Sequence, residues 1–251
     1  MENENMENVW SENRSIHPLI QPLLSQAQSD YAAFESRIVP DADPKRIIGI
    51  KVPVLRKEAR RLMKASSRNQ LHSFMLDLPH DYHEENILHA LLINEIRDFD
   101  ETCIELERFL PFVKNWKICD LLTPKSFVSE LKTEDGANRL QELMESWMDS
   151  QDLWKSRFAM RMLMNHFLKD RYSRSIVDHV CAVQSDEYYL QMMQAWYLAT
   201  ALIDHDEDVM DILESSGLPL SVHNRTIQKA IESFRISDQQ KRKLRTLRRK
   251  K

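Results

Sequence analysis

The sequence predicts an all-α protein, an α-α superhelix in which paired helices repeat as a solenoid with a concave face. Three observations predict this class. Apolar residues recur every three or four positions, alternation typical of strands is absent, and the breaks between apolar segments are short. Short connections favour antiparallel neighbours, and about a dozen stacked helices bury a continuous core. A compact all-α bundle is the competing architecture.

The expected helices are ten to twenty residues long. The clearest is ANRLQELMESWM, residues 137–148, whose apolar positions all fall on one face of a helix. The other expected helices are HSFMLDL from His72, EENILHALLINEI from Glu84, TCIELERFLPFV from Thr102, LWKSRFAMRMLMNHFL from Leu153 and EYYLQMMQAWYLATALI from Glu187. Proline and glycine mark the breaks, as at Thr123-Pro124 and Gly217-Leu218-Pro219.

Composition excludes several classes of function. The 251 residues include only three glycines, so phosphate-cradling loops and dinucleotide folds are not expected, and we expect no cofactor. The three cysteines form no CxxC pair, which argues against a disulfide framework or a structural zinc site. No apolar run reaches membrane-spanning length and no signal peptide is readable, so we expect a cytoplasmic protein without a membrane partner.

Charge is distributed unevenly along the chain. The formal net charge is -4, but the tail KRKLRTLRRKK, residues 241–251, carries eight basic residues, so the remaining 240 residues sum to -12. A nucleic-acid binder is usually basic overall, so any such surface here must be a local patch. We expect an acidic, flexible segment at 1–14, one repeat domain at 15–240, and a tail that is either a mobile basic arm or a solvated helix end.

One candidate site lies in KNWKICDLL, residues 114–122. Trp116 stands four residues before Asp120 on an expected helix, so both side chains rise from one face, one turn apart. The structural alternative is a tryptophan that fills a groove between helices, with a solvated or capping aspartate.

Two further segments carry candidate residues. In DLWKSRFAMRM, Arg157 and Arg161 are four apart on one helical face, beside Trp154, so two guanidinium groups could grip adjacent phosphates. The alternative is an ordinary basic stripe. In YYLQMMQAWYLA, Trp196 lies in a helix that is apolar almost all round, where core packing is the default.

In their order and spacing, these segments resemble a known family. NWKICD, LWKSR and QAWYLA, together with IIGIKVPVLRKEARRL at residues 47–62, resemble the DNA alkylation repair glycosylases of the AlkD type, which are built from HEAT-like repeats. HDYHEENILHALLI and TIQKAIESFRIS extend the resemblance over roughly residues 20 to 240.

The resemblance implies a glycosylase that excises positively charged N3- or N7-alkylated purines from duplex DNA without a base-binding pocket. The site residues that it implies are Asp120, Trp116 and Trp196 around the sugar, with Arg157 as a phosphate contact. We expect no metal, and a monomer, the default for this kind of repeat, that associates with the nucleoid when bound to DNA.

One departure from the family pattern bears on activity. After Trp196 the chain continues Tyr197-Leu198-Ala199-Thr200, where several active members carry arginine and glutamate in a W-x-L-R-E run. This removes a possible backbone contact. Two alternatives therefore stay open: a non-catalytic member that binds damaged or branched DNA, and a helical-repeat scaffold for protein interactions.

A histidine-rich segment, HDYHEENILH, is a weaker candidate. His80, His83, Glu84 and His89 cluster there, but their spacing is not HExxH and no further ligand is evident. We interpret them as polar residues at a helix start.

Overall fold

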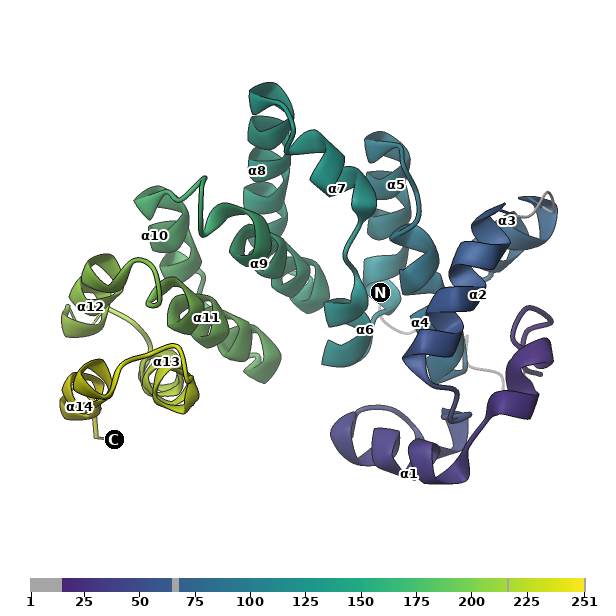
Figure 1. Ribbon diagram of the computed structural model, residues 1–251, viewed down its shortest axis with the longest axis horizontal. Coiled ribbons are helices and arrows are strands. Elements are labelled where there is room, and N and C mark those ends of the chain that lie inside the picture. Colours follow the sequence, from purple (N-terminus) through teal and green to yellow (C-terminus); the bar gives the residue numbers. More distant parts are fainter. Residues whose placement is uncertain (1–14, 65–67, 216, 251) are drawn as a thin grey trace, which may run out of the picture. The chain divides into compact units, whose positions relative to one another are not determined.

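The computed structural model describes residues 15–64, 68–215 and 217–250 (Figure 1). Within these ranges the chain is helical and contains no strand, so the predicted all-α class is confirmed. The expected acidic segment at 1–14 lies outside the described residues. No helix in the described part of the chain combines the length and apolar character needed to cross a membrane.

The chain forms two compact units that divide after Ser129. The helices of the first are α1 (Ser29–Ile38), α2 (Val52–Lys64), α3 (Arg68–Leu76), α4 (His83–Ile93), α5 (Phe99–Phe109), α6 (Trp116–Leu121) and α7 (Lys125–Glu130), with short 3-10 turns at Gln21–Gln26, Pro44–Arg46 and Leu110–Phe112. The helices of the second are α8 (Glu134–Met148), α9 (Leu153–Phe167), α10 (Arg174–Ala182), α11 (Tyr188–Ala201), α12 (Asp206–Glu214), α13 (Leu220–Glu232) and α14 (Asp238–Thr246).

In the first unit, α4 is the central helix. It packs against α2 on one side and α6 on the other, and every one of its residues is buried. The apolar face of α2 explains its side of this contact, because Leu55, Ala59 and Leu62 recur at helical spacing and are buried. The row α2, α4, α6 is therefore held by helix-on-helix packing, as the repeat class predicts.

A glycine and a buried carboxylate fix the entry to α2. Gly49 has φ +93°, and a Cβ there would lie 2.3 Å from the carbonyl oxygen of Gln28. The carboxylate of Glu84 accepts three backbone N–H groups from this segment, those of Ile48 at 2.9 Å, Gly49 at 2.7 Å and Ile50 at 3.2 Å. The glycine of the IIGIKVP segment is thus required by backbone conformation and close approach.

The second unit repeats the same packing. Helices α8 and α9 are joined by a short loop and pack together, and α9, α11 and α13 form a row in which each contacts the next. Helix α11 has neighbours on both sides, so residues around most of its circumference are buried, among them Met193 and Leu198. This explains why its sequence is apolar almost all round.

The described part of the basic tail, residues 241–250, completes the last helix and continues just beyond it. Leu244 of α14 is fully buried, and α14 packs on α13. Beyond the helix, His223 hydrogen bonds the carbonyl oxygen of Leu247, and Asn224 donates to the carbonyl oxygen of Arg249, each at 2.8 Å. In the described residues, the tail is a helix end that packs on α13.

Candidate nucleic-acid interface

Helix α6 carries the first two predicted site residues. Asn115 begins the helix by accepting the backbone N–H of Ile118 at 3.1 Å. Trp116 is the first helical residue, and Asp120 follows one turn later. Both side chains are half-buried, so neither is simple core and neither is fully solvated. The one-turn spacing predicted from the sequence is therefore present, at the surface of the first unit.

The indole of Trp116 is tied to α1. Its Nε1–H donates to the carbonyl oxygen of Ile38, the last residue of that helix, at 3.0 Å. A helix ends with carbonyl groups that lack intrahelical partners, and this bond satisfies one of them. Because the indole has a single N–H donor, what Trp116 can offer a ligand is the ring itself.

The next residue of α6 enters a buried ion pair with α1. The ammonium group of Lys117 contacts a carboxylate oxygen of Glu35, whose side chain is only 1% exposed. The hydroxyl of Tyr31 lies 3.5 Å from the same ammonium group, and His83 Nε2 lies 3.5 Å from the other oxygen of Glu35. Helix α1 therefore positions the start of α6 through both Trp116 and Lys117.

The charge state of Glu35 follows from these neighbours. Burial acts to raise the pKa of its carboxyl group, but the polar contacts with His83, Lys117 and Tyr31 outweigh burial and lower the pKa to about 2. Burial and the hydrogen bond to Glu35 raise the pKa of Tyr31. At neutral pH Glu35 is therefore a carboxylate, and it is paired with Lys117 next to Trp116.

The second unit holds the predicted arginines on α9. Asp152 caps this helix by accepting the backbone N–H groups of Trp154 and Lys155, each at 2.8 Å. Arg157 is 5% exposed, and its Nη1 donates to the carbonyl oxygen of Tyr189 at 2.8 Å. The ring of Tyr189 lies 5.4 Å from that of Trp154. These contacts join the start of α9 to the start of α11.

Arg157 and Arg161 differ in exposure although they share a helical face. Arg157 is buried, whereas Arg161 is partly exposed. Burial, together with the positive charge of Arg161, lowers the pKa of His166. Of the two arginines, Arg161 is the one with side-chain surface in solvent, and the role of Arg157 as a phosphate contact stays a prediction.

Trp196 lies at the surface of α11, whereas its neighbour is core. Trp196 is 36% exposed, whereas Tyr197 is fully buried. At the two positions where the family pattern has arginine and glutamate, Ala199 is buried and the Thr200 hydroxyl donates to the carbonyl oxygen of Trp196 at 2.8 Å. Core packing, the default expectation for Trp196, is therefore wrong, and α11 places no charged side chain at those two positions.

Helix α11 carries a row of partly exposed side chains that was not predicted from the sequence. Tyr188, Met192 and Trp196 are four residues apart, and each is at least partly exposed. Arg225 of α13 lies over the ring of Tyr188 at 4.6 Å, and its Nη1 is 2.9 Å from the sulfur of Met192. The signal available in the sequence was this spacing of four, which the apolar surroundings concealed.

The predicted site residues are divided between the two units. Trp116 and Asp120 lie together on α6, whereas Arg157 and Arg161 lie on α9 and Trp196 on α11. Within the second unit, α9 and α11 pack directly against each other. The convergence of all five on one surface stays a prediction.

The histidine-rich segment has structural contacts. His80 Nε2 and His89 Nδ1 hydrogen bond at 2.8 Å, and the ring of His89 stacks on Phe109 at 4.2 Å. Burial, then the neighbouring His80 and Arg108, holds the pKa of His89 well below its usual range. Among the described residues, no group of three or more His, Cys, Asp or Glu side chains is arranged to hold a metal ion.

These features define an all-α helical-repeat protein with partly exposed tryptophan, arginine and aspartate side chains on its packed rows. The family model for DNA alkylation repair enzymes matches residues 19–234. The chain therefore belongs to the DNA alkylation repair enzyme family. No curated protein sequence matches it.

Proposed function

We propose that this protein is a DNA glycosylase that excises positively charged N3- or N7-alkylated purines from duplex DNA. Family membership supports a role in alkylation repair and DNA as the partner. The observation that carries the glycosylase proposal is the pair on α6: Trp116 and Asp120, one turn apart and both half-buried, on a helix anchored by α1.

The chemistry of the substrate explains why a few side chains are enough for base excision. A purine alkylated at N3 or N7 is cationic, so its glycosidic bond is weak and the departing base needs no general acid. What remains is to stabilise the positive charge that develops on the sugar and to direct a water molecule to it. A carboxylate can do both, and we assign this role to Asp120.

The aromatic residues complete the environment of the sugar. A tryptophan face attracts a cation and excludes bulk water, which strengthens the effect of a nearby carboxylate. We assign this role to Trp116, whose N–H is already engaged by Ile38, and to Trp196, which is 36% exposed. Arg157 and Arg161 are assigned to the phosphates beside the lesion.

The site requires no pocket for the damaged base. Most glycosylases extrude the base into a cavity that reads its edge. Here the carboxylate and the aromatic rings act on the sugar, so the adduct is selected by its weakened bond and positive charge. The protein therefore approaches the lesion from the backbone side.

A second candidate is a family member that binds damaged or branched DNA without excising bases. The observation that favours it is the end of α11, where Ala199 and Thr200 replace the charged pair and Thr200 bonds back to Trp196. A phosphate or water contact that this pair supplies elsewhere in the family would be missing. Tight binding without base release would identify this candidate.

Excision from alkylated duplex DNA tests the first proposal. We expect wild-type protein to release N7-methylguanine or N3-methyladenine, and Asp120→Asn to reduce the rate by about 100-fold or more, because a preorganised charge at the reacting centre is lost. Asp170→Asn, which alters an exposed carboxylate after α9, is the matched control and should keep the wild-type rate. Equal release by wild type and Asp120→Asn would refute the role of Asp120.

Binding separates DNA recognition from a protein scaffold. Affinity that depends on phosphate contacts falls steeply as salt rises, because counterions are released from DNA on binding. Measured on an unmodified duplex over a range of salt concentrations, a steep slope supports either DNA-binding candidate. A chain with no duplex affinity at low salt would instead be a protein-interaction scaffold.

A further inference from the structure

Helix α2 presents a strongly basic face to solvent. Between Val52 and Lys64 it carries five basic residues and one acidic residue, Glu58, within a chain of net charge -4. The five cations are Arg56, Lys57, Arg60, Arg61 and Lys64, and they line a shallow open groove along the helix. The local charge of +4 makes α2 an exception in an acidic body.

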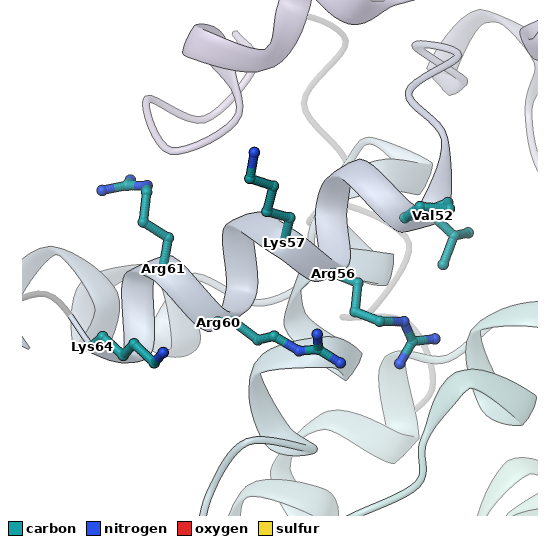
Figure 2. A pocket seen from close by; sticks show the side chains of 7 residues that line it. Val52, Arg56, Lys57, Arg60, Arg61 and Lys64 are labelled. Atoms are coloured by element: carbon teal, nitrogen blue, oxygen red, sulfur yellow. The ribbon is translucent and has the colours of Figure 1, made fainter.

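The cations occupy one side of the helix. At 3.6 residues per turn they fall within an arc of about 140°. The opposite side is apolar and buried, with Leu55, Ala59 and Leu62 in contact with the rest of the unit. Figure 2 shows Lys57 and Arg61 leaving one edge of the helix and the other three cations leaving the other edge.

Within the described residues, only part of this charge is neutralised. Arg61 forms a pair with Glu58, with nitrogen–oxygen distances of 2.6 and 2.8 Å, and Arg60 lies 3.6 Å from Glu95. Among the described residues, no carboxylate lies within ion-pair distance of Arg56, Lys57 or Lys64. These three cations are therefore available to an external anion. Without such an anion, they repel one another.

We propose that this face of α2 binds the sugar-phosphate backbone of duplex DNA at a distance from the reacting sugar. The proposal rests on the proposed function, since it takes duplex DNA as the substrate. It adds an anchoring surface, defined by Arg56, Lys57 and Lys64, to the residues that act at the lesion.

The dimensions suit a phosphate backbone. Arg56 and Lys64 are eight residues apart, about 12 Å along the helix axis. A DNA strand advances about 3.4 Å per nucleotide along the duplex axis, and consecutive phosphates are farther apart along the winding strand, so the face is long enough for about two to three phosphates. Long, flexible lysine and arginine side chains can each reach a phosphate oxygen without reading a base edge. The face would therefore position the duplex without adding sequence preference.

A membrane surface is a poorer occupant. A helix that lies in a membrane interface inserts its apolar face into lipid while its cations contact head groups. The apolar face of α2 is buried against its own unit, so only charge is available. Such a face fits a polyanion in solution, and DNA is the polyanion that the family acts upon.

Binding of an unmodified duplex tests the proposal. Affinity for DNA falls as salt rises, and each phosphate contact contributes about 0.9 to the steepness of log affinity against log salt. In the triple variant Arg56→Gln, Lys57→Gln, Lys64→Gln, this plot should therefore be less steep by about two to three. The single-turnover rate on alkylated DNA, at saturating protein, should stay within about twofold of wild type, since these residues act on binding alone.

Two control variants make the result specific. Lys132→Gln, Lys169→Gln, Arg245→Gln removes the same charge from three separate exposed positions of the second unit and should keep the wild-type slope. Arg56→Lys with Lys57→Arg retains the charge of α2 and should also keep it. A triple variant of α2 with wild-type slope, or a second-unit control that loses as much, overturns the proposal.

Failure of this proposal is distinguishable from failure of the proposed function. If Asp120→Asn abolishes excision while the α2 triple variant binds DNA as wild type does, the glycosylase proposal is supported and the anchoring surface is refuted. If the salt dependence of DNA binding depends on α2 but the wild-type protein releases no base, the anchoring surface is supported and the glycosylase proposal is refuted.

Discussion

The indole N–H of Trp116 donates to the carbonyl oxygen of Ile38 at 3.0 Å, so the first residue of α6 is fastened to the last residue of α1. This bond gives Trp116 a structural task in addition to its proposed position beside the sugar. Separating the two tasks requires a substitution that removes the donor and keeps an aromatic face.

Trp116→Phe is that substitution. We expect the free energy of unfolding to fall by about 1 kcal/mol, because the carbonyl group of Ile38 loses its donor. Trp196→Phe is the matched control: the N–H of Trp196 donates to no described residue, so its stability should change by less than about 0.5 kcal/mol. Urea unfolding of both variants checks the difference, and equal losses would show that the Ile38 bond contributes nothing.

The ion pair of Glu35 and Lys117 predicts a pH dependence of stability. The pKa of Glu35 is lowered from 4.5 to about 2, so its contribution is fully present above about pH 4.5 and is lost as the pH falls from there toward 2. At about 1.4 kcal/mol per pKa unit, the contribution at neutral pH is about 3 kcal/mol.

Glu35→Gln should therefore be destabilised most at pH 7, where it leaves the ammonium group of Lys117 without its buried partner. The deficit relative to wild type should shrink as the pH falls toward 3. Urea unfolding at several pH values measures both proteins. A deficit that is the same at pH 7 and pH 3 would contradict the assigned charge state of Glu35.

Trp196 and Tyr197 are adjacent in sequence but should respond differently to truncation. Trp196→Ala removes a side chain that is 36% exposed, so we expect weaker DNA binding and slower excision with a small loss of stability. Tyr197→Ala empties a fully buried site and should cost about 3 to 5 kcal/mol. Thermal unfolding and excision assays of the pair distinguish the two roles. The reverse pattern would place Trp196 in the core.

Arg157 and Arg161 form a second contrasting pair. Arg157→Gln removes the bond to the carbonyl oxygen of Tyr189 and should lower the free energy of unfolding by about 2 kcal/mol. Arg161→Gln should reduce the salt slope of DNA binding by about one. If Arg161→Gln binds with the wild-type slope, Arg161 contacts no phosphate.

Gly49 and Gly217 predict opposite outcomes for the same substitution. Gly49→Ala combines φ +93° with a Cβ only 2.3 Å from a backbone oxygen, so we expect a loss of about 2 kcal/mol or more. Gly217→Ala meets nothing closer than 3.7 Å and should be neutral or slightly stabilising. Denaturant midpoints of the two variants test this. A tolerated Gly49→Ala would mean that the entry to α2 adjusts.

Much of the fold could be predicted from the sequence. The segments with a 3, 4 period correspond to helices, as in residues 137–148, which lie within α8, and in the segment from Leu153, which forms α9. Periodicity succeeds there because one face of each helix is buried and the other is not. It is less informative for α11, which is flanked by α9 and α13.

The candidate site was only partly predictable. The spacing of Trp116 and Asp120 follows from helix geometry alone and is present in α6. The burial of Arg157, the ion pair between Lys117 and Glu35, and the partly exposed row on α11 that ends at Trp196 depend on contacts between helices distant in sequence. A helical period contains no information about which neighbour covers which face.

The sequence by itself determined the helical class, the approximate extent of the helices and, through collinear motifs, the family. Tertiary structure alone decided that Trp196 is exposed while Tyr197 is core, and that most of the basic side chains of α2 are exposed. The physical reason is that secondary structure depends on local spacing, whereas exposure depends on which surfaces the packed helices leave uncovered.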